Sequence, residues 1–199
     1  MSEYREKNVY RELFKSRRDS MSDFVYRSSS RSICRNLSTL ALISSATTIH
    51  AFWPVLARRE PDIRSFLIEL AGNDFRVVLP IVTAFTKELS ERPRLRHVEF
   101  SGVDQLRLNR WGIYEPVNGN DVGTDEIDLI VAPALVVDMR GYRLGHGYGY
   151  YDEFLSGLKI PVICPIFADW VVDALPHDEN DVPVSLIVTE KEIIDLTKT

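Results

Sequence analysis

The sequence predicts an α/β fold: a three-layer domain in which a mostly parallel, Rossmann-like sheet is flanked by helices. Short apolar runs rich in β-branched residues recur along the chain, and helical stretches separate them. The most apolar run, Ile127–Val137, is typical of a central strand. Strands alternating with helices indicate a parallel sheet covered on both faces. The 199 residues fit a single domain over residues 1–199.

Helices are predicted where apolar residues recur at helical spacing next to capping residues. Ser22 is suited to be the N-cap of the second helix, and proline at position 61 suits the first position of the third. Glycine at position 72 is a typical residue for ending that helix. The predicted helices are residues 3–18, Ser22 to about Leu37, Pro61–Gly72 and Tyr150–Leu158.

Strands are predicted at the apolar, β-rich runs. Pro80 is expected to stop the second strand, because proline cannot donate to a sheet ladder, and Pro133 lies near the end of the central strand. Asn118–Asp125 is a loop by composition. The predicted strands are Thr47–Phe52, Phe75–Leu79, His97–Phe100, Ile127–Val137, Pro161–Phe167 and Ser185–Val188.

Composition excludes several classes of partner. The net charge of −5 gives no bulk attraction to nucleic acid or to an anionic membrane, so neither partner is expected. Cys34 and Cys164 match no metal-ligand spacing and no disulfide framework. No apolar run approaches the ~20 residues that cross a bilayer, and the charged N-terminal segment is unlike a secretory signal. We therefore expect a cytoplasmic protein.

A glycine-rich segment, RLGHGYGYYD at residues 143–152, lies between the central strand and the last helix. Glycine allows positive φ and lets backbone N–H groups approach an oxyanion, and the helix N-terminus favours phosphate. Arg143, expected in the same loop, adds a fixed positive charge. The spacing differs from the Walker A loop and from the dinucleotide fingerprint G-x-G-x-x-G. The segment is thus a candidate phosphate cradle; the alternative is a turn that only connects strand to helix.

The whole stretch from residue 128 to 155, DLIVAPALVVDMRGYRLGHGYGYYDEFL, resembles the signature of the 5-formyltetrahydrofolate cyclo-ligase family. That pattern runs D-x-I-x-x-P-G-L-A-F-D and then G-x-R-L-G-x-G-x-G-Y-Y-D-x-x-L. The resemblance extends over nearly the whole chain. It includes Lys7 and Arg11 in the first helix, Glu60-Pro61 before a helix, and the P-x-x-x-x-D pattern that ends at Asp181.

The resemblance implies roles for named residues. Catalytic residues would be Arg143, His146 and Tyr150. Contacts to ATP would come from Lys7, Arg11, Arg143, Leu144, Gly145, His146, Gly147, Tyr148, Gly149, Tyr150 and Tyr151. Substrate would be bound by Val55, Glu60, Trp111 and Tyr150, and Mg²⁺ by Asp152 and Asp181.

Each motif outside the glycine run also has a simpler interpretation. Lys7 and Arg11 could belong to a solvated helix face, and Glu60 could be an acid favoured by a helix dipole. Trp111 could be a core tryptophan. The two aspartates could cap turns or helices.

Four positions depart from the family pattern. Tyr148 stands where many members have lysine and others glycine, and His146 stands where some have arginine. Ala134 replaces the usual glycine of P-G-L, and Trp170 stands where glutamine is common. The first two lower the positive charge around a triphosphate.

The resemblance implies an ATP- and Mg²⁺-dependent reaction that closes 5-formyltetrahydrofolate to 5,10-methenyltetrahydrofolate and releases ADP and phosphate. ATP would phosphorylate the formyl oxygen, and N10 would then attack the activated carbon. The substrate is a small molecule, with or without a polyglutamate tail, and the enzyme would be a monomer or weak dimer.

Two other functions predict different sequence features. A nicotinamide-dependent dehydrogenase would need an early glycine fingerprint with an acidic residue about 20 residues further on, and the sequence has neither. A non-catalytic nucleotide- or folate-binding member of the same fold is the alternative that the loss of the lysine at position 148 favours. An assay for the methenyl product would separate it from an enzyme.

Overall fold

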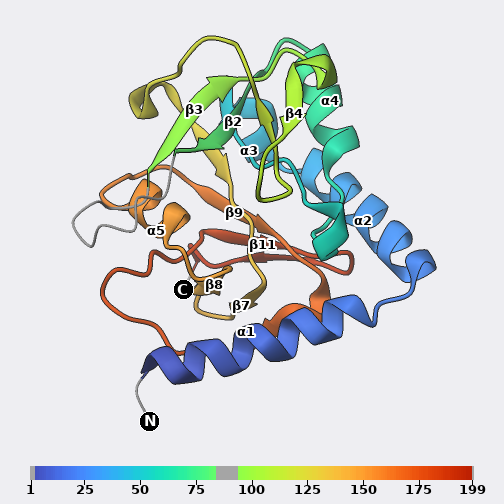
Figure 1. Cartoon of the computed structure of the whole chain (residues 1–199), viewed down its shortest axis with the longest axis vertical. Coiled ribbons are helices and arrows are strands. Elements are labelled where there is room, and N and C mark those ends of the chain that lie inside the picture. The colour runs from blue at the N-terminus through green and yellow to red at the C-terminus, as the bar shows by residue number, and fades with distance from the viewer. Residues whose placement is uncertain (1–2, 84–93, 199) are drawn as a thin grey trace.

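A computed structural model describes residues 3–83 and 94–198. Within these residues, its main sheet has seven strands in the order β12-β11-β9-β6-β1-β2-β3 (Figure 1). The five inner strands, from β11 to β2, are parallel to one another, while the edge strands β12 and β3 are antiparallel to β11 and β2. The strands are β1 (Thr48–His50), β2 (Arg76–Val82), β3 (Leu95–Glu99), β6 (Leu129–Val131), β9 (Val162–Pro165), β11 (Leu186–Val188) and β12 (Ile193–Asp195). The predicted α/β class with a mostly parallel sheet is confirmed.

Helices flank this sheet. The helix α2 packs against α4 and β11, and α1 lies along the lower edge of the molecule in Figure 1, in contact with β7. Val25 N donates to Ser22 Oγ at 3.3 Å, which confirms the predicted N-cap. The helices are α1 (Glu3–Asp19), α2 (Asp23–Ser38), α3 (Ala41–Ser45), α4 (Arg64–Gly72) and α5 (Tyr150–Leu155), with short 3₁₀ turns at Leu56–Arg58, Val103–Gln105, Thr124–Glu126 and Ala168–Trp170.

Two helix boundaries differ from prediction. The helix α4 begins at Arg64 and not at Pro61, because the Asp62 carboxylate binds both the backbone N–H and the guanidinium of Arg64 and holds the preceding residues outside the helix. The helix α5 ends at Leu155 and not at Leu158. Gly157 lies just beyond it at φ +78°, a conformation that ends a helix.

Pro80 does not stop the second strand, since β2 continues to Val82. The Val78 carbonyl accepts from Ala51 N, so this side of β2 faces β1. Pro80 lies two residues further on and faces the same side, where β1 has already ended at His50. Its missing N–H therefore removes no ladder hydrogen bond.

The run Ile127–Val137 is not one strand. Its first part is β6 in the main sheet, and its second part is β7 (Val136–Asp138) in a separate sheet with β8 (Arg143–Leu144) and β10 (Val171–Val172). The chain leaves the main sheet at Pro133, after Ala132 N donates to Ile163 O. Apolar residues at every position from 129 to 137 hid this change of sheet, because both strands are buried.

The topology sets where a ligand can bind. The chain proceeds from β1 to β2 on one side, and the strands β6, β9 and β11 follow on the other side. The strand order therefore reverses between β1 and β6, and in open α/β sheets a ligand crevice lies at such a point, beyond the carboxyl ends of the strands. A hairpin of β4 (Leu106–Leu108) and β5 (Tyr114–Pro116), which was not predicted, stands beside β2.

Candidate active site

A cleft of about 1030 Å³ lies at this switch point. Its walls come from α1, from the segments that follow β1 and β6, from the glycine run and from residues 178–182. Every site residue predicted from the sequence lies in its lining: Lys7, Arg11, Val55, Glu60, Trp111, Arg143, Leu144, Gly145, His146, Gly147, Tyr148, Gly149, Tyr150, Tyr151, Asp152 and Asp181. Residues up to 174 positions apart in the chain are thus brought into one cleft.

The glycine run turns sharply between β8 and α5. Gly147 has φ +94° and Gly149 has φ +74°, a region that side chains rarely adopt. Arg11 Nε donates to Gly145 O at 3.1 Å, and a Cβ at position 147 would lie 3.2 Å from the Arg11 guanidinium carbon. The positive φ therefore favours glycine at 147, and Arg11 packs closely against it, so Arg11 does not lie on a solvated helix face.

Arg143 was expected in the loop, and this was wrong: it belongs to β8 and is 4% exposed. Its backbone pairs with Val137 of β7, so the residue is part of a ladder. Nη1 donates to Asp152 Oδ1 at 3.0 Å and to Val182 O at 2.7 Å. Nη2 is buried and has no hydrogen-bond partner among the described residues. A buried guanidinium nitrogen in a cleft wall is suited to an anionic acceptor.

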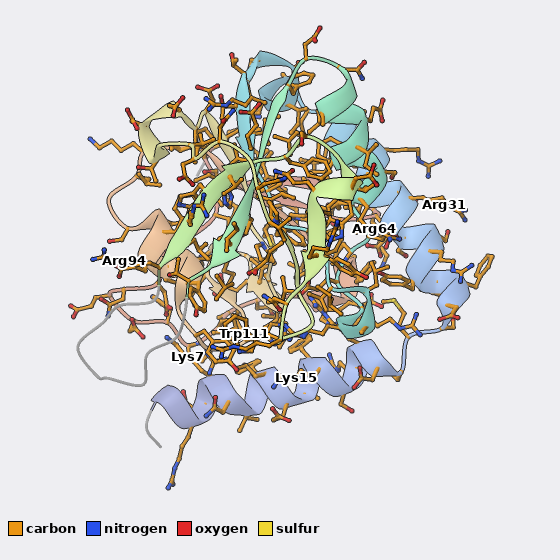
Figure 2. All side chains as sticks on the ribbon, turned by 45° about the horizontal axis from the view of Figure 1, so that its top comes forward. Lys7, Lys15, Arg31, Arg64, Arg94 and Trp111 are labelled. Atoms are coloured by element: carbon orange, nitrogen blue, oxygen red, sulfur yellow. The ribbon has the colours of Figure 1, made fainter. Side chains whose placement is uncertain are left out.

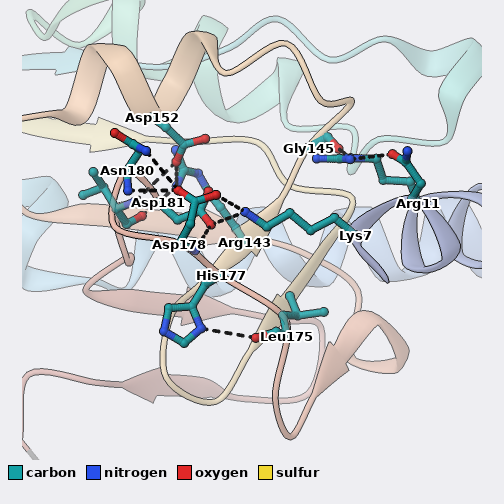
Figure 3. Close-up of polar contacts among 12 residues, drawn as sticks. Lys7, Arg11, Arg143, Gly145, Asp152, Leu175, His177, Asp178, Asn180 and Asp181 are labelled. Carbon is teal, nitrogen blue, oxygen red and sulfur yellow. Dashed lines mark hydrogen bonds and ion pairs between the residues drawn. The ribbon is translucent and has the colours of Figure 1, made fainter. Parts of the chain in front are cut away.

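Lys7 is buried and holds two carboxylates together (Figure 3). Its Nζ lies 2.7 Å from Asp178 Oδ2 and 2.6 Å from Asp181 Oδ2. Burial lowers the pKa of Lys7, but the hydrogen bonds to these two aspartates outweigh burial, so the pKa is raised overall. Figure 2 shows Lys7 on the side of α1 that faces the body of the protein, which contradicts a solvated helix face.

Asp178 is a cleft residue that the sequence did not reveal. It precedes Asp181 by three residues, and its backbone N–H donates to Asp181 Oδ2 at 2.8 Å. The hydrogen bond from Lys7 is the main cause of its lowered pKa. The one available signal was a second aspartate inside the P-x-x-x-x-D segment.

Asp152 and Asp181 offer the carboxylate oxygens expected as Mg²⁺ ligands. The pKa of the Asp152 carboxyl is raised by burial, with Arg143 opposing this shift and the nearby Asp181 charge adding to it. Among the described residues no three acidic, histidine or cysteine side chains form a metal cage. Mg²⁺ commonly uses one or two carboxylates together with phosphate oxygens and water, so two neighbouring aspartates fit this ion.

Glu60 lines another part of the cleft, beside the glycine run. It is 8% exposed, and its Oε2 accepts from Val55 N at 2.8 Å, which links two predicted substrate residues. Its Oε1 lies 3.7 Å from His146 Nε2, a contact that the sequence did not indicate. The glycine run and the Glu60 segment therefore meet in the cleft.

Trp111 is 37% exposed, so it is not a core tryptophan. Its carbonyl accepts from Arg58 Nη2 at 3.1 Å, and the Arg110 guanidinium lies 4.2 Å from its ring centroid. Trp53 and Glu115 also line the cleft. Neither was predicted as a site residue. A contact between distant segments places Glu115 there, because its Oε1 accepts from Val82 N at 2.7 Å.

The fold matches those of known proteins. The NMR structure of the Aquifex aeolicus 5,10-methenyltetrahydrofolate synthetase aligns with a TM-score of 0.81 and 27% identity, over 96% of this chain and 92% of that one. A Mycoplasma pneumoniae 5,10-methenyltetrahydrofolate synthetase shares the fold, with a TM-score of 0.72 and 23% identity over 92% of this chain and 98% of that one.

Sequence comparison gives the family. The model of the 5-formyltetrahydrofolate cyclo-ligase family matches residues 3–190. The chain therefore belongs to this family of ligases. One relative is a probable 5-formyltetrahydrofolate cyclo-ligase of Schizosaccharomyces pombe, which is 29% identical over 75% of this chain and 72% of the relative. The 5-formyltetrahydrofolate cyclo-ligase of Escherichia coli K12 is 28% identical over 67% of this chain and 74% of that relative.

A membrane-spanning helix was not expected. In residues 3–83 and 94–198, every helix is too short or too polar to cross a bilayer.

Proposed function

We propose that this protein closes 5-formyltetrahydrofolate to 5,10-methenyltetrahydrofolate in a reaction that consumes ATP, requires Mg²⁺ and releases ADP and phosphate. The observation that carries the proposal is Arg143. In a chain of the cyclo-ligase family, its buried Nη2 has no acceptor among residues 3–83 and 94–198, and Arg143 lines the cleft beside the glycine run. A phosphate oxygen would supply the missing acceptor.

The chemistry needs activation of a poor electrophile. The nitrogen of an N-formyl group donates into the carbonyl, so the carbon resists attack until the formyl oxygen is phosphorylated. Transfer of the γ-phosphoryl group to that oxygen releases ADP, and attack by N10 on the activated carbon then expels phosphate. The protein has to align the two partners and stabilise charge on the phosphoryl oxygens.

The cations of the cleft are suited to the negative charge of the ATP phosphates. Lys7, Arg11 and Arg143 converge from α1 and β8, and backbone N–H groups of residues 145–149 would bind phosphate oxygens. Mg²⁺, held by Asp152 and Asp181, would neutralise further phosphate charge. His146 and Tyr150, near the middle of the run, would donate hydrogen bonds to the transferring group.

The wall with Glu60 is suited to the folate. Glu60 Oε1 can accept from N–H groups of the reduced pterin, while Oε2 is held by Val55 N. Trp111 and Tyr150 offer flat aromatic surfaces for the pterin or aminobenzoyl ring. The two substrates would meet at the glycine run, where His146 approaches Glu60.

Mixing purified protein with ATP, Mg²⁺ and 5-formyltetrahydrofolate tests the proposal. We expect an absorbance increase from the methenyl product that requires all three components. The exposed Tyr148, in the position of a lysine, favours a second candidate, a binder without turnover. A binder would show thermal stabilisation by either ligand without product.

We further propose that the protein acts in the cytoplasm as a monomer or weak dimer, without nucleic-acid or membrane partners. The net charge of −5 supports the last two points. Elution volume and light scattering would test the oligomeric state.

A further inference from the structure

Arg18 is a buried cation that the reaction above does not use. It lies near the end of α1, is 1% exposed, and is among the largest fully buried side chains. Its Nη2 donates to the carbonyls of Ala134 at 2.5 Å and Leu135 at 3.2 Å. Among the described residues no carboxylate forms an ion pair with it, and its Nε has no hydrogen-bond partner. Burial lowers the pKa of Arg18, with the more distant Glu60 charge opposing.

Stability alone does not explain a guanidinium at this position. Moving a charge out of water is costly; an apolar side chain of similar length would avoid that cost but would leave the carbonyls of Ala134 and Leu135 without this donor. The guanidinium makes directional hydrogen bonds. It binds two particular carbonyl oxygens and thereby sets how α1 lies against the chain beyond β6.

Those carbonyls belong to the cleft. Ala134 and Leu135 line it just after the main sheet ends. Leu135 N donates to Leu144 O at 2.7 Å, so the segment bound by Arg18 is itself bound to β8, directly before the glycine run. Arg11 reaches the same run through Gly145 O. The helix is therefore attached to the cleft wall at two points.

Helical spacing places three cations of α1 on one face. Lys7, Arg11 and Arg18 are four and seven residues apart, and eleven residues make close to three turns. Over that distance α1 rises about 16 Å. A small sliding or rotation of the helix at Arg18 would therefore displace the Lys7 amine from its place between Asp178 and Asp181 (Figure 3).

We propose that Arg18 is a positioning residue for the nucleotide site. By binding the carbonyls of Ala134 and Leu135, it sets the docking of α1, so that Lys7 and Arg11 reach the phosphates. This inference rests on the proposed function, since it concerns the ATP half of the cleft. The 3₁₀ turn Leu56–Arg58 next to Glu60 also contacts α1, and the Glu60 charge acts on Arg18. Glu60 is itself held by Val55 N, so folate binding should weaken less than ATP binding when Arg18 is removed.

The test compares two variants of the same helix. Arg18→Met keeps the length of the side chain and removes both hydrogen bonds, whereas the matched control Phe14→Leu changes packing at an equally buried position. Calorimetry would give the Kd for ATP with Mg²⁺ and, separately, for 5-formyltetrahydrofolate. We expect Arg18→Met to weaken ATP binding about tenfold or more, and folate binding by a clearly smaller factor.

The control and a third variant separate positioning from general damage. Phe14→Leu should lower the Tm and leave both Kd values unchanged, and Arg18→Lys should recover part of the ATP affinity. If Arg18→Met does not fold, the same two Kd values measured for Arg18→Lys test the proposal in its place. Equal loss of ATP and folate affinity in Arg18→Met, or the same ATP loss in Phe14→Leu, would overturn the proposal.

Amide hydrogen exchange tests whether Arg18 sets the docking of α1 independently of the proposed reaction. Without ligand, Arg18→Met should speed exchange of the Leu135 amide, which donates to Leu144 O, while Phe14→Leu should not. If wild-type protein did not bind ATP, the proposed function would fail, and exchange at this amide would still decide whether Arg18 sets the docking. Unchanged exchange in Arg18→Met would refute it.

Discussion

At the scale of single residues, side chains of the cleft both hold neighbouring segments in place and offer atoms to a ligand. Arg143 holds Asp152 and Val182 through Nη1 while its Nη2 remains without a partner among the described residues. Glu60 holds Val55 N with one oxygen and approaches His146 with the other. Substitutions at these positions should therefore change stability as well as binding, and the experiments must separate the two.

Arg143→Ala should reduce turnover by about two orders of magnitude or more, since it removes a charged donor from a mostly dry site. It should also destabilise the fold by roughly 2 kcal/mol, because the Asp152 carboxylate and the Val182 carbonyl lose their donor. Turnover, ATP KM and urea unfolding would be measured together. Arg143→Lys should also be impaired, as lysine cannot replace a forked guanidinium. Wild-type turnover with unchanged ATP affinity would contradict this role.

Glu60→Gln should weaken folate binding while sparing ATP binding. The amide keeps one acceptor oxygen, which can remain with Val55 N, so the substitution removes mainly the acceptor that faces His146. We expect a loss of about tenfold in folate affinity. Calorimetry with each ligand measures this, and a loss confined to ATP would show that the residue serves the other substrate.

Tyr148→Lys should change turnover little. Tyr148 is 59% exposed, and its ring centroid lies 6.3 Å from that of Tyr150. Arg143, Lys7 and Arg11 already line the phosphate side of the cleft. We therefore expect kcat and ATP KM to stay within about threefold of wild type, a change of less than 1 kcal/mol. A gain of a hundredfold in the lysine variant would instead indicate a site that has lost catalytic power.

At the scale of elements, α5 rests on a pair of buried histidines. His50 at the end of β1 and His97 in β3 have ring centroids 5.0 Å apart, and both pack against Phe154 of α5. Both His50 nitrogens, His97 Nδ1 and the Tyr151 hydroxyl are buried without a hydrogen-bond partner among the described residues. Burial, with His97 adding to it, keeps the pKa of His50 well below its usual value, so the pair is neutral near pH 7.

This pair should make the protein sensitive to mild acid. In the unfolded chain histidine titrates near pH ~6.5. Because the folded pKa is depressed, stability is fully present above that pH and falls as the pH drops below it. The slope is at most about 1.4 kcal/mol per pH unit for each histidine. His50→Leu should reduce the difference in Tm between pH 7.5 and pH 5.5, whereas His177→Asn, which removes a half-buried ring stacked on Tyr142, should not. An undiminished difference in His50→Leu would exclude His50 as its source.

At the scale of the whole molecule, local patterns could be predicted and long-range contacts could not. The Ser22 cap, the α/β class and the glycine turn at Gly147 each depend on a few neighbouring residues. The change of sheet at Pro133 and the continuation of β2 through Pro80 depend on what lies beside the strand. Asp178 is bound by Lys7, 171 residues away, and that long-range contact could not be predicted from the residues around Asp178.

The bridge from Lys7 to Asp178 and Asp181 has a consequence for biosynthesis. The first helix leaves the ribosome early, but its carboxylate partners follow only after more than 170 further residues. Closing such a long loop has to wait until the chain between the two ends is available to form the sheet. A nascent or truncated chain that lacks residues beyond 177 should therefore fail to complete the nucleotide pocket, so capture on immobilised ATP would distinguish finished molecules from unfinished ones.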